Sequence, residues 1–245
     1  MLMKTIPLHL PAEALHPQAT ACLSCEVRGN ALFGVLDEHA LGRVHAHIAS
    51  QEALGDQAIY TAGRPGSAVY TVRRGIVRFE RFTEGGARRI VRLAGPGDLI
   101  GQEALLGRPY AEEAVACTTV HLCRIPAALV MQMSHLEAQL YGALLVRWQK
   151  ALEHAEDWVT DLTIGLARRR LLKLLGRIAG FEPTSDLIWL PRREEIGAML
   201  DMSMETASRL VSGLKREGVL ELMPPSHARM HRGRWRQALE EMDTY

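Results

Sequence analysis

The amino-acid sequence predicts an α+β protein with two domains, the first built mainly of strands and the second mainly of helices. Three observations carry this prediction. The chain has 245 residues, more than a single domain usually contains. Residues 57–125 alternate apolar and polar side chains in short runs separated by glycine and proline, which is typical of antiparallel strands. After Pro126 the apolar spacing changes to that of helices.

The strand region contains both alternation and turn signals. Val77 and Phe79 are expected to face the core, and Arg78 and Glu80 are expected to face solvent. The run 83–86, Thr-Glu-Gly-Gly, predicts a hairpin turn between this strand and the next. Repeated strands and turns of this kind predict a small sandwich or roll.

The charge of the chain is unevenly distributed. Hydrophobic residues make up 47% of the chain and charged residues 23%, which excludes a disordered protein. The formal net charge is only +1. Basic residues nevertheless outnumber acidic ones between Arg168 and Arg236. A local basic face is what a nucleic-acid-binding domain uses to neutralise phosphates.

The N-terminal residues do not resemble a targeting segment. Pro7 and Pro11 interrupt the apolar residues there, and no stretch of the chain reaches ~18 apolar residues. We therefore expect a cytoplasmic protein with no membrane contact. In such a protein four cysteines favour redox chemistry, metal ligation or simple burial over disulfides.

Apolar residues between positions 141 and 162 recur in alternating steps of four and three, over about three heptads. This spacing is typical of a helix that pairs with a second helix. A long helix packed on its own β-domain is the alternative, but a second stripe (Leu136, Leu140 and Leu144) is available for that packing. We assign the first stripe to a dimer seam. The seam comprises Tyr141, Leu145, Trp148, Leu152, Ala155, Val159 and Leu162.

Two short helices follow near the C-terminus. Residues 190–200 predict an amphipathic helix with Ile196, Met199 and Leu200 on one face. Residues 201–203 interrupt it, and Ser203 is a suitable N-cap for a second helix over 204–216. Two helices joined by a three-residue turn predict a helix-turn-helix.

The second helix carries polar side chains opposite its apolar face. A glutamate there accepts a hydrogen bond from cytosine N4, and an arginine donates two to guanine. The alternative is a solvated face with an ion pair between Glu205 and Arg209, which the preceding helix and turn disfavour. The predicted DNA-binding residues are Ser203, Glu205, Ser208, Arg209, Ser212 and Arg216.

The run Glu-Thr-Ala-Ser-Arg-Leu at 205–210 resembles the recognition helix of the Crp/Fnr family of bacterial transcription regulators, in its Fnr-type branch. In that branch a glutamate, a serine and an arginine read half-sites of the form TTGAT. The runs 57–63 and 97–101, together with Gly75, are similar to turns of the family's β-roll. The likeness covers nearly the whole chain from Cys22 onward.

The resemblance implies a β-roll sensor domain of the cyclic-nucleotide-binding type, a long dimerisation helix and a C-terminal winged helix. It also implies a homodimer that binds double-stranded DNA and contacts RNA polymerase. The expected parts are a cysteine-containing segment at 1–30, the β-roll at 31–130, the dimerisation helix at 131–165 and the DNA-binding domain at 166–245, with its wing near 219–232.

Members of the family that bind cyclic AMP grip its phosphate with an arginine–serine pair. Aligned on Gly101, the two positions of that pair hold Glu112 and Glu113 in this chain. Two carboxylates repel a phosphate, so the resemblance predicts that cyclic AMP is not bound in this way.

Three cysteines match a further family feature. Cys22 and Cys25 form a Cys-x-x-Cys, and Cys123 lies at the end of the roll, a set suited to a metal or an iron–sulfur cluster. In oxygen-sensing Fnr members four cysteines hold a four-iron cluster. The fourth position corresponds to Ala31, or to Phe33 with the spacing of a related subgroup. The resemblance thus implies a response to oxygen or redox state with one ligand missing.

Several alternatives stay open at this stage. Cys117, expected on the same strand face as Cys123, is either a substitute ligand or a core residue. His121 shares that face and is a weaker candidate. The Cys-x-x-Cys is also compatible with a redox-active thiol pair. A regulator with haem or with no cofactor is a further possibility, although His45 and His47 are interpreted as surface residues.

Two other classes of function are disfavoured. An enzyme with a metal in the mouth of the roll needs several converging histidines or carboxylates, and His121 is the only histidine between 57 and 125. An electron carrier would leave the helix-turn-helix unexplained. We therefore predict a regulator that is not an enzyme.

Overall fold

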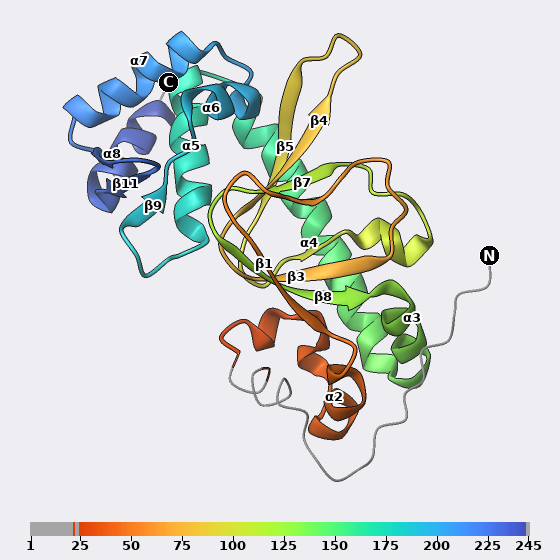
Figure 1. Ribbon diagram of the computed structural model, residues 1–245. Helices are drawn as coiled ribbons and strands as arrows, with labels where there is room; N and C mark the ends of the chain where they lie inside the picture. The colour runs from red at the N-terminus through yellow and green to blue at the C-terminus, as the bar shows by residue number, and fades with distance from the viewer. Residues whose placement is uncertain (1–21, 23–24, 244–245) are drawn as a thin grey trace. The chain divides into compact units, whose positions relative to one another are not determined.

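The computed structural model describes Cys22 and residues 25–243, so most of the expected N-terminal segment 1–30 lies outside the described residues. The chain divides into two compact units (Figure 1). One unit comprises Met1–Glu80 and Leu93–Leu152, and the other comprises Arg81–Arg92 and Glu153–Tyr245.

The β-domain contains two four-stranded sheets, in the orders β1-β8-β3-β6 and β2-β7-β4-β5. Strand β3 pairs antiparallel with both β6 and β8, and β4 pairs antiparallel with β7. This arrangement confirms the predicted roll. The strands are β1 (Ala49–Ala53), β2 (Ala58–Tyr60), β3 (Ala68–Arg74), β4 (Val77–Phe82), β5 (Arg88–Ala94), β6 (Leu99–Ile100), β7 (Glu113–Ala116) and β8 (Val120–Pro126).

The alternation along β4 is only partly as predicted. Val77 and Phe79 are fully buried, as expected. Arg78 and Glu80 are buried as well, so the prediction that they face solvent is wrong. Nε of Arg78 donates to Oε1 of Glu80 at 2.6 Å, and its Nη2 pairs with Oδ1 of Asp56 at 3.1 Å. Because these charges are paired, the second face of the strand is covered without leaving an isolated ion.

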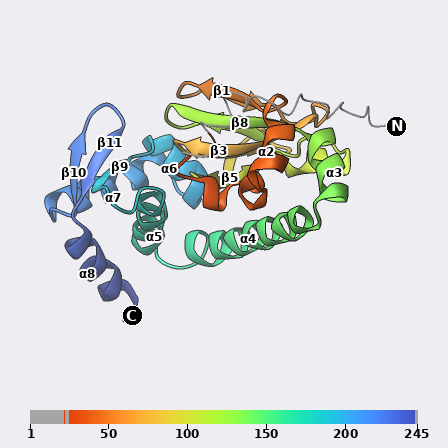
Figure 2. The same ribbon diagram turned by 90° about the horizontal axis from the view of Figure 1, so that it is seen from below.

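Short helices precede the roll and longer ones follow it. Asp37 caps α2 by accepting a hydrogen bond from the backbone nitrogen of Ala40 at 2.7 Å. Helix α4 is long and uninterrupted (Figure 2). These helices are η1 (Arg28–Asn30), η2 (Leu32–Val35), α2 (Glu38–His45), η3 (Gln102–Leu106), α3 (Ala127–Leu136) and α4 (Ala138–Leu162).

Helices α3 and α4 are separated at Glu137, where the backbone is extended. Leu140 and Leu144 are buried, as expected for the stripe that packs within the chain. Leu136 is exposed, because it belongs to α3 rather than to the long helix, so its assignment to that stripe was wrong.

The C-terminal unit contains a three-stranded sheet, in the order β10-β11-β9, and four helices after α4 in the described part of the chain. The β10–β11 hairpin confirms the predicted wing. The elements are α5 (Ala167–Gly180), β9 (Leu187–Trp189), α6 (Arg193–Leu200), α7 (Met204–Arg216), β10 (Leu220–Met223), β11 (His227–Met230) and α8 (Arg232–Asp243).

Helix α8 was not predicted. Nε1 of Trp235 donates to the carbonyl of Leu172 in α5 at 2.9 Å, and Ala238 is buried one turn later. The spacing of Trp235 and Ala238 could have indicated this helix, but the signal is weak because the surrounding residues are mostly polar or charged.

Among the described residues, no helix combines the length and apolarity needed to span a membrane.

Candidate DNA-binding interface and cysteine pocket

Helices α6 and α7 form the predicted helix-turn-helix. The Glu195 carboxylate accepts a hydrogen bond from the backbone nitrogen of Arg192 at 2.7 Å and so closes the start of α6. Asp201 has a left-handed backbone, with φ of 53°, and ends that helix. Oγ of Ser203 accepts from the backbone nitrogen of Thr206 at 3.2 Å, which makes Ser203 the N-cap of α7 as predicted.

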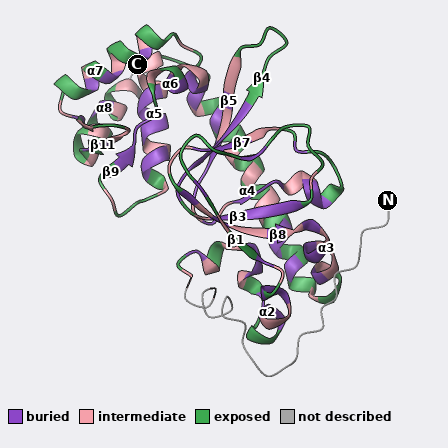
Figure 3. Ribbon diagram, in the orientation of Figure 1, coloured by how far each residue is buried: buried purple, intermediate pink, exposed green. Residues whose placement is uncertain are grey.

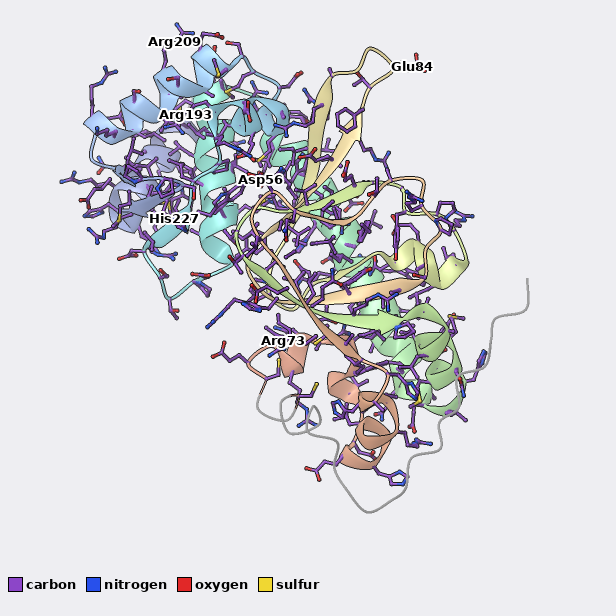
Figure 4. All side chains as sticks on the ribbon, in the orientation of Figure 1. Asp56, Arg73, Glu84, Arg193, Arg209 and His227 are labelled. Atoms are coloured by element: carbon purple, nitrogen blue, oxygen red, sulfur yellow. The ribbon has the colours of Figure 1, made fainter. Side chains whose placement is uncertain are left out.

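One face of α7 anchors the helix and the other is free. Ala207, Val211 and Leu214 are buried. Figure 3 shows exposed stretches along α7, and Arg209 projects outward from the helix (Figure 4). The six predicted DNA-binding residues are all exposed: Ser203, Glu205, Ser208, Arg209, Ser212 and Arg216.

The charges on this face remain available to a ligand. Hydrogen bonds from its own backbone N–H and from the Ser203 side chain lower the pKa of Glu205, and Arg209 adds to that effect. The carboxylate is therefore ionised at neutral pH. Nη2 of Arg209 donates to Oγ1 of Thr206 at 3.3 Å, a contact that can be exchanged for one with a base.

Part of the predicted basic face is used inside the unit instead. Arg168 donates two hydrogen bonds to the Glu217 carboxylate, at 2.9 and 2.6 Å. Nη1 of Arg170 donates to the carbonyl of Leu200 at the end of α6. These two arginines hold α5 against the helix-turn-helix, so the charge run in the sequence overstates the basic surface.

Sequence reasoning missed an exposed apolar residue of α7. Met204, the first residue of the helix, is exposed although it is apolar. The signal that could have found it is an apolar residue directly after an N-cap and next to the polar face of the helix.

The predicted seam on α4 is largely exposed. Tyr141, Leu145, Leu152 and Val159 are 59%, 49%, 54% and 55% exposed. Trp148 is half-buried and Ala155 is exposed. Leu162 is fully buried, so it is not available to a partner and its assignment to the seam is corrected.

Cys22, Cys25 and Cys123 line one cavity of about 40 Å³, so the structure brings the three matched cysteines together. Arg28 and Arg73 line the same cavity. Thr71 also lines it, and its buried Oγ1 has no hydrogen-bond partner among the described residues.

Burial keeps two of the thiols of this cavity, those of Cys22 and Cys123, protonated at neutral pH. It raises the pKa of Cys123 to about 11, and repulsion from Cys22 and Cys25 adds to the shift, while Arg73 opposes it. Burial is also the main cause that raises the pKa of Cys22. The neutral thiols of Cys22 and Cys123 thus lie in one cavity with two guanidinium groups, those of Arg28 and Arg73.

The position of the missing fourth cysteine is apolar in the structure as well. Ala31, Phe33 and Gly34 form that wall of the cavity. Among the described residues, no three cysteine, histidine or acidic side chains are placed to hold a metal ion together. A cluster held by four thiolates, as the resemblance implies, therefore does not fit this donor set.

Cys117 does not replace the missing ligand. Strand β7 ends at Ala116 and β8 begins at Val120, in the other sheet, so Cys117 lies in a turn and not on a face shared with Cys123. Its backbone nitrogen donates to the carbonyl of Ile76 at 2.8 Å. The expectation failed because a turn of three residues interrupts the assumed strand.

The histidines are also placed differently from expectation. Nδ1 of His121 pairs with Oε2 of Glu52 at 3.6 Å, and His121 does not line the cavity. His45 is fully buried at the end of α2, so its interpretation as a surface residue was wrong. His47 lies beyond the end of that helix and is half-buried.

A β-roll, a long helix with an exposed apolar stripe and a winged helix-turn-helix together define a DNA-binding transcription regulator. Residues 51–135 match the family model of the cyclic nucleotide-binding domain. This match and the relatives described next support a regulator of the Crp/Fnr family.

Similar proteins cover most of the chain. A probable transcriptional activator from Rhizobium leguminosarum bv. viciae is 28% identical over 82% of this chain and 85% of its own length. The fumarate and nitrate reduction regulatory protein of Yersinia pestis is 24% identical over 83% of this chain and 84% of its own length. The structure of FixK2 from Bradyrhizobium japonicum matches with a TM-score of 0.70 and 25% identity, covering 80% of this chain and 96% of that one.

Proposed function

We propose that this regulator is of the Fnr type, that it is not an enzyme, and that it acts in the cytoplasm as a homodimer on a TTGAT-like palindrome. The observation that carries the proposal is the exposed face of α7, in which Glu205, Ser208 and Arg209 stand one turn apart beside a capped N-terminus. The match to the Yersinia pestis regulator supports the branch. The name of the Rhizobium relative supports a role in activation, which involves contact with RNA polymerase.

In this proposal each exposed side chain of α7 contacts a different part of the half-site. Arg209 donates to guanine O6 and N7, and Glu205 accepts from cytosine N4. Met204 lies beside them and presents an apolar surface suited to a thymine methyl group. Ser212 and Arg216, further along α7, are placed for phosphates rather than bases.

The exposed stripe of α4 supplies the dimer contact in this proposal. Trp148 and its symmetry mate anchor it, and each ring buries ~150 to 250 Å² in such contacts. Tyr141, Leu145, Leu152 and Val159 extend the contact to either side. A two-fold dimer places two recognition helices on half-sites ~34 to 36 Å apart, which matches a palindrome.

The signal enters, in this proposal, through the cysteine pocket and not through cyclic AMP. Glu113 pairs in register with Glu80 across β7 and β4, and Glu112 precedes it. Carboxylates at these positions disfavour a cyclic phosphate. The thiols of Cys22, Cys25 and Cys123 are therefore the sensor group in this proposal.

The proposal is tested by fluorescence anisotropy with a labelled TTGAT palindrome. We expect a two-fold dimer to bind it at least about a thousandfold more tightly than a duplex with both half-sites scrambled, measured at one salt concentration. Equal affinity for the two duplexes would contradict sequence-specific binding. Cyclic AMP added at millimolar concentration should leave the affinity unchanged.

A further inference from the structure

Arg147 is the one residue of α4 whose guanidinium joins the helix to the segment that carries the Cys-x-x-Cys, within the described part of the chain. Its Nη2 donates to the carbonyl of Asn30 at 2.7 Å and to the carbonyl of Ala31 at 2.5 Å. Its Nη1 donates to the carbonyl of Ala143 on α4 itself, at 2.8 Å. The side chain is half-buried, which lowers the pKa of Arg147, and an arginine stays charged at neutral pH.

A regular series of backbone hydrogen bonds leads from the thiols to these carbonyls. The nitrogen of Cys25 donates to the carbonyl of Cys22 at 3.2 Å, Arg28 to Cys25 at 2.9 Å, and Ala31 to Arg28 at 3.1 Å. Gly34 then donates to Ala31 at 3.0 Å, so the Ala31 carbonyl accepts from both the turn series and Arg147.

The segment has little room to adjust on its own. A Cβ on Gly34 would come within 1.9 Å of the Arg28 carbonyl oxygen, so the turns are packed against one another. Asn30 also packs closely on Gly97 of the roll. A displacement at Cys22 or Cys25 is therefore transmitted along the turns and not absorbed by them.

The other end of this connection is the apolar stripe. Arg147 lies between Leu145 and Trp148 of the proposed seam, while its guanidinium reaches the opposite side of the helix. Charge-assisted hydrogen bonds to half-buried carbonyls are strong and directional, so they cannot stretch without cost. The position of the helix and that of the turn series are thus tied to each other.

We propose that Arg147 is a positioning residue that couples the chemical state of the cysteine pocket to the dimer seam of α4. This inference rests on the proposed dimer and adds the route by which the pocket acts on it. Coupling of this kind is reciprocal: whatever factor the pocket imposes on dimer affinity, dimer formation imposes on the pocket.

The test uses methyl methanethiosulfonate on the full chain with Cys117→Ser as background. A thiolate attacks the reagent, a thiomethyl group is transferred to the cysteine sulfur and methanesulfinate leaves, and intact mass reports the number of groups added. Sedimentation then gives the dimer Kd of the unmodified and modified chains. We expect modification to change that Kd by about tenfold, within the usual range of coupling, and dithiothreitol to reverse the change.

Arg147→Met is the decisive variant, because it removes the guanidinium and keeps an unbranched side chain. We expect it to form dimers whose Kd no longer responds to modification. Lys150→Met is the matched control: it removes a positive charge one turn along α4, where Lys150 pairs with Asp98 at 2.9 Å, and should keep the full response. Arg147→Lys retains a charged donor and should keep part of the change in dimer Kd on thiol modification.

A second measurement needs no variant at Arg147. The rate of thiomethylation in the parent chain should differ below and above the dimer Kd, because dimer formation fixes the position of the turn series that carries Cys22 and Cys25. An unchanged Kd on modification, or a response that persists in Arg147→Met, would overturn the coupling. A parent chain that stays monomeric and ignores the palindrome would instead overturn the proposed function.

Discussion

The recognition face of α7 and the cysteine pocket are built in opposite ways. The first consists of exposed residues one turn apart on a single helix, held by Ser203 at one end and by Ala207, Val211 and Leu214 beneath. The second draws residues from positions 22 to 125, buries them, and raises the pKa of the Cys123 thiol to about 11.

This difference separates two tasks. A surface that reads DNA needs charges that are already ionised and lie in solvent until phosphates and bases replace the water. A sensor needs groups that stay unreactive until a specific change occurs, and burial among apolar side chains provides that. Changes to the exposed base-reading side chains should therefore act mainly on DNA affinity, and changes to the pocket should act first on thiol reactivity.

The largest expected effect is that of Arg209→Ala on DNA binding. The loss of one bidentate contact costs ~1 to 3 kcal/mol per half-site, so a dimer reading two half-sites should lose at least about 30-fold in affinity for its palindrome. Anisotropy measures the loss, and circular dichroism should show an unchanged fold. Arg236→Ala, an equally exposed arginine on α8, serves as the control. Wild-type affinity in Arg209→Ala would show that α7 is not the reading helix.

Leu152→Glu should weaken the dimer. Each new carboxylate would be buried against its twin, a cost of several kcal/mol that corresponds to roughly a hundredfold or more in the dimer Kd. Sedimentation at micromolar concentration measures it. Val146→Glu is the matched control, because Val146 is 66% exposed on the same helix but lies off the seam. Equal effects of Leu152→Glu and Val146→Glu on the dimer Kd would show that the dimer contact is not the assigned stripe of α4.

The reactivity of the Cys123 thiol should depend on pH in the alkaline range. Because the pKa of Cys123 is about 11, its alkylation by iodoacetamide should quicken roughly tenfold per pH unit up to that value. In the urea-unfolded chain the rate should level off near pH ~8.5. The same shift favours the folded state below the unfolded pKa and loses that contribution as pH rises through about 11. A plateau near pH ~8.5 in the folded chain would mean that Cys123 is not buried with the other thiols.

Ser203→Ala should have the smallest effect. Loss of the cap on α7 costs about 1 kcal/mol of stability, measured as a lower midpoint of urea unfolding. Ser212→Ala, exposed in the middle of the same helix and making no cap, should leave the midpoint nearly unchanged. A midpoint in Ser203→Ala equal to that of the parent would show that the helix start does not depend on this hydroxyl.

Local pattern was enough to predict the helix-turn-helix. The N-cap at Ser203, the apolar spacing of Ala207, Val211 and Leu214 and the break at residues 201–203 all act within one or two turns of chain. The roll and the wing were likewise predicted, because alternation and turn residues are short-range signals. Residues whose environment comes from distant segments were predicted less well.

Tertiary structure alone decided the rest. Alternation along β4 placed Arg78 and Glu80 on one face, but only packing buries that face and pairs them with each other and with Asp56. The period of α4 identified its apolar stripe, but only the fold buries Leu162 while leaving Leu152 exposed. The Cys-x-x-Cys spacing identified two of the cysteines as candidate ligands. Which strands pair and which turns pack together decided that Cys22, Cys25 and Cys123 line one cavity and that Cys117 does not. The same packing decided that Arg147 contacts the turn at Ala31. The physical reason is the same in each case. Turns and helix periods depend on residues that are close in sequence, whereas burial and contacts depend on segments that only folding brings together.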